Sequence, residues 1–344
     1  KSSNNKINAR FAGKNTIGFV YSESSKKEVF LQIADKALQT IVTQTLINSP
    51  TATTASAEVS DIVEHQNGFG IFWNETDNDG KSKAYYRDWG YSSQPNNNIL
   101  GLPNSLSQQA TKQALLNGSD YILVGLGQDT SGNNVVYIEK RNMSGLLDFQ
   151  KNIASSLDDI SGVSASLGNN EIIINWTINN QIFLTVLDIN GNFKTDYNPP
   201  IDISSSSYSS VFLGKNAFDG TNYNIIFRGC VTDCNTDPGF FIATFGSDGK
   251  RVLQDYPFVK ADIDESIDFF WNSTRQEFAA LYSKTQDGLH FITLDIQGTV
   301  TFDASITTDT TDLFPSLYWN GQNYMILFHR AEKNIFISNQ CNWN

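Results

Sequence analysis

The sequence predicts an all-β protein, a seven-bladed β-propeller of four-stranded antiparallel blades. Two observations predict it. A pattern of a turn followed by an apolar strand is repeated along the 344 residues, and the composition favours strands. Aromatic residues make up 12% of the chain, with 23 Phe and 13 Tyr, and such side chains fit a pleated, half-buried surface. Hydrophobic residues reach 40%, which is enough for the core of one large all-β domain.

The repeat is anchored on the residue that opens an apolar strand after each polar turn. Such anchors recur at a spacing of about 50 residues, in the range of propeller repeats. They are Ile17, Phe69, Tyr121, Ile172, Tyr223, Phe278 and Tyr324. Because one unit cannot bury its apolar faces alone, stacked neighbours must cover them. The repeat therefore indicates seven blades in a single domain over 1–344.

Each unit has the same internal order. A short alternating strand precedes a Gly/Asn turn and the anchored strand, and a variable loop leads to a third strand such as "QIFLTVLD". Several third strands end in a tight turn, as at Asp188–Gly191 and Asp295–Gly298, where Gly permits a positive φ. A weaker fourth strand follows. The expected blades are approximately 7–50, 56–103, 110–155, 160–205, 208–258, 264–306 and 314–344 plus N-terminal residues.

Two segments, 34–47 and 105–116, also have a pattern that a helix would satisfy. The repeat register requires strands at both places, so we predict strands. The last unit ends after its third strand, and a ring must close. We therefore expect residues around Lys1 to Ile7 to supply or extend the missing outer strand.

The pattern W-N-G-x-x-Y, followed by an apolar alternation and later by L-D-x-x-G, resembles the repeats of secreted β-propellers in bacterial extracellular and surface proteins. It covers nearly the whole chain, and its motif residues, as in "YWNGQNYMILF", are structural. The resemblance implies a propeller fold. Proteins with such repeats include binding domains, adhesins and parts of larger enzymes, so no catalytic residue carries over. The acidic residue that often follows the second strand is missing here in most units.

The formal net charge is −12 and the sequence pI about 4.7. A field of that sign repels nucleic-acid phosphates and anionic lipid, so neither is an expected partner. The sequence contains no apolar run of about 18 residues, so it predicts no membrane-spanning helix. The chain begins at Lys1 and not at Met, which is typical of a processed or excerpted start. We expect a secreted or cell-surface protein.

The three cysteines are Cys230, Cys234 and Cys341. A C-x-x-x-C spacing in a chain with 3 His is a poor metal site. A Cys230–Cys234 disulfide is the better interpretation, and it implies an oxidising compartment. Cys341 ends a third strand, on the opposite face and too distant to bridge, so we predict that it is unpaired.

Loops entering the first strands share one face with those joining second and third strands, and this face is the usual ligand site. Four entering loops are acidic, with Asp61, Asp158, Asp159, Asp262, Asp264, Glu265, Asp268, Asp309 and Asp312. At a channel mouth they could bind a cation or act as an acid/base pair on a sugar. They could also be ordinary polar loops of an acidic chain. His65 is either a channel histidine or a satisfied buried one.

Glu75-x-Asp77-x-Asp79-Gly80 has the spacing of the first ligands of a calcium loop. The helix-loop-helix version needs a Glu at position 86, which is Tyr here. Calcium is therefore a possible cofactor, and an ordinary Asp-Gly hairpin is the alternative.

Trp89, in "YYRDWGYSS", could stack on a sugar or pack against the next blade. Five N-glycosylation motifs are present, about the number that chance gives in an Asn-rich chain. Their acceptors are Asn74, Asn117, Asn142, Asn175 and Asn272.

The leading functional hypothesis is an extracellular binding or assembly protein, lectin-like or adhesin-like, with the propeller as a platform for a glycan or protein partner. A glycoside hydrolase or lyase using channel-mouth carboxylates is one alternative. A structural subunit of an extracellular filament or coat is another. A non-enzymatic role is favoured because the sequence contains no nucleophile elbow, phosphate loop or redox motif.

Overall fold

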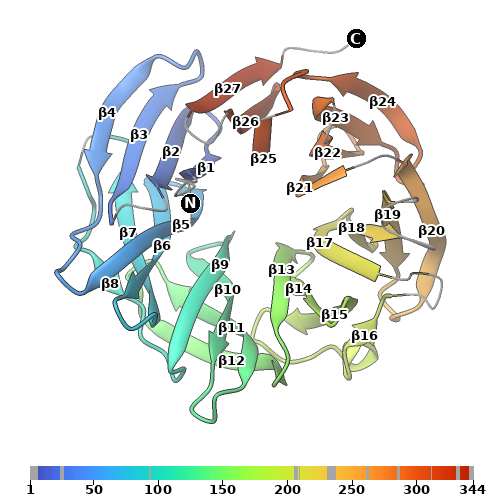
Figure 1. Cartoon of the computed structure of the whole chain (residues 1–344), viewed down its shortest axis with the longest axis horizontal. Coiled ribbons are helices and arrows are strands. Elements are labelled where there is room, and N and C mark those ends of the chain that lie inside the picture. The colour runs from blue at the N-terminus through green and yellow to red at the C-terminus, as the bar shows by residue number, and fades with distance from the viewer. Residues whose placement is uncertain are drawn as a thin grey trace. The chain divides into compact units, whose positions relative to one another are not determined.

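The computed structural model describes residues 7–23, 27–92, 94–204, 208, 210–230, 238–260, 263–284, 287–310, 312–330 and 334–340. Over these ranges the secondary structure is strands and one short 3-10 turn, η1 (Thr195–Tyr197). Within the same ranges, no helix has the length and hydrophobicity needed to cross a membrane. The all-β prediction is confirmed (Figure 1).

The chain divides into two compact units. Unit 1 comprises Lys1–Leu157 and Tyr318–Asn344, and unit 2 comprises Asp158–Leu317. Unit 1 holds three four-stranded sheets. The first contains β1 (Ile7–Ala12), β2 (Thr16–Glu23), β3 (Val29–Asp35) and β4 (Thr40–Leu46). The second contains β5 (Thr54–His65), β6 (Gly68–Asp77), β7 (Ser82–Gly90) and β8 (Leu100–Gly101). The third contains β9 (Gln108–Asn117), β10 (Asp120–Gln128), β11 (Asn134–Asn142) and β12 (Leu147–Ser156).

Unit 2 likewise holds three four-stranded sheets. The first contains β13 (Ile160–Leu167), β14 (Glu171–Ile178), β15 (Gln181–Asp188) and β16 (Ile201–Asp202). The next contains β17 (Ser210–Phe218), β18 (Tyr223–Cys230), β19 (Pro238–Phe245) and β20 (Arg251–Lys260). The last contains β21 (Ile263–Asn272), β22 (Glu277–Lys284), β23 (Gly288–Leu294) and β24 (Val300–Ser305).

A further sheet, with β25 (Asp312–Trp319), β26 (Tyr324–Arg330) and β27 (Asn334–Gln340), has three strands in the described part of the chain. The four-stranded antiparallel blade is thus confirmed in six sheets, and a count of seven such blades stays a prediction. Ile7 begins β1, which pairs with β2 in the first sheet. The expected closing strand before it falls on residues 1–6, which lie outside the described ranges.

In each sheet the strands pair in the order of the sequence. The two segments with a helix-compatible pattern are strands, β4 and β9, as the repeat predicts. A local 3.6-residue pattern gives way here because the neighbouring strand offers backbone partners along the whole segment, from Asn117 opposite Asp120 to Gln108 opposite Gln128.

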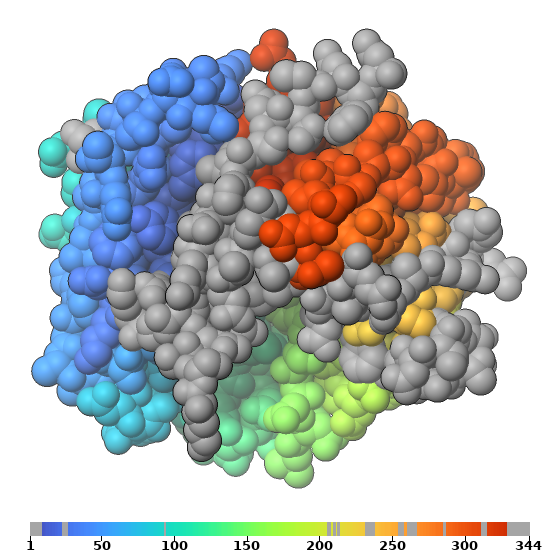
Figure 2. Space-filling model, turned by 45° about the horizontal axis from the view of Figure 1, so that its top comes forward, coloured from blue at the N-terminus to red at the C-terminus, as the bar shows by residue number. Residues whose placement is uncertain are grey.

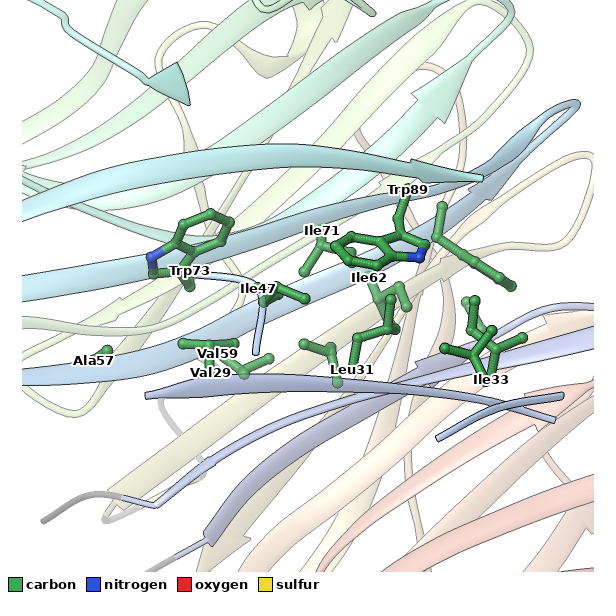
Figure 3. Packing of buried hydrophobic residues seen from close by; sticks show 14 residues of the cluster. Val29, Leu31, Ile33, Ile47, Ala57, Val59, Ile62, Ile71, Trp73 and Trp89 are labelled. Atoms are coloured by element: carbon green, nitrogen blue, oxygen red, sulfur yellow. The ribbon is translucent and has the colours of Figure 1, made fainter. Parts of the chain in front are cut away.

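Second strands are covered on both sides, so their burial does not alternate, and the same holds for the third strands β19 and β23. All eight residues of β19 are buried. In unit 1, cluster residues from β2 and β3 face others from β5, β6 and β7 (Figure 3). Trp73 and Trp89 are the largest side chains there. In unit 2, equivalent clusters lie between the sheets that contain β14 and β18, and β18 and β22. The core is therefore a series of layers between consecutive sheets.

One turn geometry recurs where strands pair across a short hairpin. In the Asp77 turn, Oδ1 accepts the N–H groups of Asp79 and Lys81 at 3.0 and 2.8 Å, and the Asp77 carbonyl accepts the N–H of Gly80. Turns with the same hydrogen bonds start at Asp35, Asp129, Asn142, Asp188 and Asp295. Gly80 has φ 79°, a conformation that disfavours every residue with a Cβ.

Gly80→Ala is expected to destabilise unit 1 by about 1 kcal/mol, the cost of the left-handed backbone region. A Cβ at Gly80 would meet nothing within 4 Å, so packing adds nothing. The neighbouring exposed Asn78, replaced by Ala, is the control and should leave the urea midpoint unchanged. Equal losses in the two variants would contradict the turn geometry.

Candidate functional site

Two acidic residues that the sequence assigned to a channel mouth join first strands of consecutive sheets. Asp61 lies within β5, and its Oδ2 accepts the N–H of Ala114 in β9 at 2.9 Å. In unit 2, Asp268 in β21 accepts the N–H of Leu317 in β25 at 2.7 Å. Asp61 was predicted to be a ligand residue of an entering loop. The loop placement is wrong, because Asp61 lies inside β5 and its carboxylate satisfies a backbone donor of the next sheet, and its role as a ligand residue stays a prediction.

The other predicted mouth residues are described only in part. Asp159 is exposed just before β13, and Asp158 accepts a hydrogen bond from Asn179 at 2.9 Å. Asp264 and Asp312 belong to β21 and β25, but their side chains lie outside the described part. A ring of carboxylates at this face remains a prediction.

His65 is the satisfied buried histidine and not an open channel residue. It is 5% exposed, and its Nε2 donates to Asp88 Oδ1 at 3.0 Å. Its Nδ1 accepts the N–H of Asn67 at 3.3 Å. Both ring nitrogens of a neutral imidazole are therefore occupied, so the ligand-binding assignment of His65 is wrong.

Trp89 is a core residue. It is 3% exposed and belongs to the cluster between the first and second sheets. The guanidinium carbon of Arg87 lies 5.1 Å from the centre of its ring. The hypothesis that Trp89 stacks on a sugar is therefore wrong, since neither face of a ring packed in this cluster is open.

The predicted calcium ligands do not form one site. Glu75 is 8% exposed, and its carboxylate accepts hydrogen bonds from Trp73 Nε1 at 3.0 Å, Asn48 Nδ2 at 3.1 Å and Thr54 Oγ1 at 3.3 Å. Asp77 Oδ1 is used by its own turn. Within the described ranges no group of three or more His, Cys, Asp or Glu could hold a metal ion. The set Glu75, Asp77 and Asp79 is thus wrong as a cluster, and the loop is the Asp-Gly hairpin.

Three predicted glycan acceptors are buried. Asn74 is 7%, Asn175 0% and Asn272 2% exposed. Asn74 Nδ2 donates to the carbonyl of Thr111, and Asn175 Nδ2 to that of Gly214, at 2.9 and 3.0 Å. The glycosylation assignments of these three residues are wrong, because a glycan on a buried amide would separate the packed sheets.

Asn117 and Asn142 lie half-buried at the ends of β9 and β11, so glycosylation at these two stays a prediction. Cys230 ends β18 and is buried, while Cys234 and Cys341 lie outside the described part. The Cys230–Cys234 disulfide therefore also stays a prediction.

A different group of side chains gathers around Glu64, all of them in unit 1. Glu64 Oε1 accepts the hydroxyl proton of Tyr91 at 3.1 Å, and Oε2 accepts the N–H of Lys14 at 3.0 Å. The Tyr91 hydroxyl is also 2.9 Å from the His65 carbonyl, so its one proton serves either acceptor. Tyr318 completes the group: it packs edge-on against Phe11 at 5.9 Å. We call Lys14, Glu64, Tyr91 and Tyr318 the Glu64 site.

The Glu64 site is half open to solvent: Glu64, Tyr91 and Tyr318 are half-buried, and Lys14 is exposed. Each Glu64 oxygen accepts one hydrogen bond from described residues, about half of its capacity. The Tyr91 ring is held edge-on against Phe69, with centroids 5.4 Å apart. Tyrosine rings beside a carboxylate that can still accept hydrogen bonds suit a polyhydroxylated ligand.

The Glu64 carboxylate also contributes to the raised pKa values of Tyr91 and Tyr318. Burial, and next the Glu64 carboxylate, raise the pKa of Tyr91 to about 12. The pKa of Tyr318 rises to about 12 for the same two reasons, although a backbone hydrogen bond from Gly13 lowers it. Both tyrosines are therefore neutral hydroxyl donors over the physiological range.

Alkaline titration provides a prediction. An unfolded tyrosine ionises near pH 10.0, whereas Tyr91 and Tyr318 ionise near 12 when folded. Their contribution to stability is fully present below pH 10 and is lost as the pH rises toward 12. Difference absorbance of tyrosinate should show both groups titrating late, and Glu64→Gln should move them to lower pH. An unchanged titration curve in that variant would contradict the site's geometry.

Sequence reasoning missed Glu64, although a signal was present. The residue five positions before the anchor is apolar in five other repeats. Those residues are Ala12, Leu116, Leu167, Phe218 and Trp319. A carboxylate at Glu64 breaks a position that packing otherwise fills, and such local exceptions tend to mark functional sites.

Unit 2 has a second cluster of titratable side chains, which is closed. Lys194 Nζ lies 2.7 Å from Glu171 Oε1 and 2.9 Å from the Tyr223 hydroxyl, and that hydroxyl also bonds Glu171 Oε2. Tyr223 is 1% exposed. Because Lys194 neutralises Glu171 and Tyr223 is buried, this cluster links β14 to β18 and leaves little for a ligand.

Comparison with solved structures identifies the fold. The BP39L lectin from Burkholderia pseudomallei matches at a TM-score of 0.69 and 9% identity, over 99% of this chain and 98% of the lectin. The Dos1 propeller matches at 0.58 and 9% identity, over 98% and 93%. The Hadza microbial sialidase Hz136 matches at 0.53 and 8% identity, over 86% of this chain and 66% of the sialidase. The chain is thus a β-propeller with four-stranded antiparallel blades.

No protein-family description matches the sequence, and no curated protein matches it either. At identities below 10% the structural likeness establishes the fold alone. Function must therefore be argued from the Glu64 site.

Proposed function

We propose that this protein is a secreted or cell-surface glycan-binding β-propeller, lectin-like or adhesin-like, with the Glu64 site as a contact point for sugar. Its seven sheets would form seven blades, the last one completed by chain that precedes Ile7. The observation that carries the proposal is the half-open Glu64 carboxylate, which accepts the hydroxyl proton of Tyr91 at 3.1 Å. Sugar hydroxyls donate to carboxylates, and tyrosine rings pack on the apolar faces of sugars.

The match to a lectin over nearly the full length of both chains supports a propeller platform for glycans. The protein's net charge of −12 speaks against nucleic acid and anionic membranes as partners.

The test is a glycan array probed with the wild-type protein and two variants, Glu64→Gln and Tyr91→Phe. We expect binding that both variants weaken while their melting temperatures stay close to wild type. The matched control is Asp79→Asn, an exposed carboxylate of the same sheet. Running the array with and without calcium also tests the remaining cofactor expectation. Binding that Asp79→Asn and Glu64→Gln weaken equally would contradict the proposal.

A hydrolase is the second candidate, because a tyrosine hydroxyl beside a carboxylate can serve as a nucleophile with its base. Two features favour binding over hydrolysis. Burial, and next the Glu64 carboxylate, raise the pKa of Tyr91 to about 12, which keeps the hydroxyl protonated. Within the described ranges no second open carboxylate contacts the site. Release of chromophore from aryl glycosides, abolished by Tyr91→Phe, would favour the hydrolase.

An assembly role is the third candidate. β4 has seven residues, without charge or proline, and it exposes Ile41 and Leu46 at 52% and 43%. Uncharged edge strands tend to pair with other chains, and β4 lies at the outer edge of its sheet (Figure 1). The first sheet, in blue, also reaches the surface in Figure 2. A concentration-dependent increase in mass that Thr43→Lys removes would support this role.

A further inference from the structure

The charge of the Glu64 site bears on which glycans it binds. This inference rests on the proposed function. Three buried or half-buried carboxylates elsewhere in the described part have cationic partners, whereas Glu75 and Asp61 accept hydrogen bonds from neutral donors. Glu139 pairs with Arg141 at 2.7 Å, Glu171 with Lys194 at 2.7 Å and Glu277 with Arg275 at 2.5 Å.

Glu64 differs from these carboxylates. Its contacts are a backbone N–H and a tyrosine hydroxyl, at 3.0 and 3.1 Å, and both are neutral donors. Within the described ranges, no ion pair involves it. The cationic residue of the Glu64 site is Lys14. Its side chain is exposed, and it contacts Glu64 through its backbone N–H. The negative charge of Glu64 is therefore not neutralised by a described side chain.

Behind Glu64 lies a second negative group. Asp88 accepts hydrogen bonds from His65 Nε2 at 3.0 Å and from Asn96 Nδ2 at 2.9 Å. The two carboxylates sit on β5 and β7, the strands on either side of β6, and the register places them on opposite faces of the sheet. A ligand group that reaches Glu64 therefore meets a negative potential, in a chain whose net charge is −12.

The tyrosines add a second preference for a cation. The face of an aromatic ring is negative, so a positive group near Tyr91 or Tyr318 is attracted to it. An anionic sugar, such as a sialic or uronic acid, would bring a like charge to Glu64. Such a contact costs free energy, because the hydrogen-bond donors of Glu64 are both neutral.

We propose that the Glu64 site selects glycans that carry a protonated amine, with the ammonium group against Glu64 and beside Tyr91. Acidic glycans are excluded by like charge. Neutral glycans bind more weakly, through hydroxyl donors alone.

The experiment compares two ligands of one backbone: an oligomer of glucosamine and the same oligomer of N-acetylglucosamine, measured by calorimetry on the whole protein near pH 6. A sialylated oligosaccharide is the third ligand. We expect the glucosamine oligomer to bind at least about tenfold more tightly than the acetylated one, since a hydrogen bond to a charged group is the stronger kind. The sialylated sugar should give no heat.

Glu64→Gln should remove most of the preference between the first two ligands, because the glutamine amide keeps the size and loses the charge. Tyr91→Phe should keep the preference, since the ring and Glu64 both remain. Added salt should weaken the binding of the glucosamine oligomer and leave the binding of the acetylated oligomer unchanged.

The outcomes separate two failures. If an acidic or acetylated glycan binds best, and Glu64→Gln weakens it, the selectivity is wrong while glycan binding survives. If no glycan on the array binds, the proposed function itself fails. A preference for glucosamine that persists in Glu64→Gln reflects the charge of the whole chain and overturns the assignment to this site.

Discussion

Replacing Arg141 by alanine is expected to destabilise unit 1 by about 3–5 kcal/mol, because the buried Glu139 carboxylate loses its counter-ion. Glu139 is 0% and Arg141 3% exposed, and Arg141 Nε donates to Glu139 Oε2 at 2.7 Å. Arg141 also donates to the carbonyls of Pro103 and Gly145, at 2.7 and 3.0 Å. Arg141 therefore neutralises Glu139 and also holds the connection from β8 to β9 through the Pro103 carbonyl.

The loss should depend on pH. Burial raises the pKa of Glu139 above its ordinary 4.5, and Arg141 opposes this shift. Without Arg141 the pKa rises further, so the folded variant holds a proton that the unfolded chain releases. Its stability is then fully present below pH 4.5 and is lost as the pH rises through the folded pKa.

Urea denaturation at pH 7 and near 4.5 measures both effects. The deficit of Arg141→Ala should be large at pH 7 and smaller at 4.5. A double variant, Glu139→Leu with Arg141→Met, is the control, since it removes both charges and should recover much of the stability. A deficit that is the same at both pH values would show that packing, and not the unpaired carboxylate, carries the effect.

Replacing Trp73 by alanine is the second large expected effect, about 3–5 kcal/mol, the usual range for an aromatic core residue cut back to Ala. Trp73 is 0% exposed and stacks on Tyr85 with ring centroids 5.8 Å apart. Its indole nitrogen donates to Glu75 Oε1 at 3.0 Å. The variant thus opens a cavity and also removes a donor from a buried carboxylate (Figure 3).

Trp89 provides a matched control in the same cluster. It is similarly buried, but its indole nitrogen has no hydrogen-bond partner among described residues. Trp73→Phe should therefore cost about 1–3 kcal/mol more than Trp89→Phe, the price of one lost bond to a buried charged group. Equal unfolding midpoints for the two phenylalanine variants would show that the Trp73–Glu75 bond contributes nothing.

The sequence alone determined the strands and their grouping. Apolar strands that are covered on both faces, turns that require Gly or Asn, and a spacing near 50 residues are properties of neighbouring residues, so the chain displays them directly. The structure confirms four-stranded antiparallel blades, and strands where a helix pattern competed, at β4 and β9. The "WN" residues are turn formers, as predicted: Asn320 Oδ1 accepts the N–H groups of Gln322 and Asn323.

The candidate site was a different matter, because a polar residue's role depends on which atoms lie opposite it. Asp61, Glu75 and Asn74 looked like surface ligands, yet each is used by a backbone or side chain brought close by folding. The surroundings of Glu64 are formed by Lys14, Tyr91 and Tyr318, which lie far from it along the chain. Local pattern thus fixes strands and turns, whereas only the packed sheets decide which carboxylates are satisfied and which, like Glu64, can still accept hydrogen bonds at the surface.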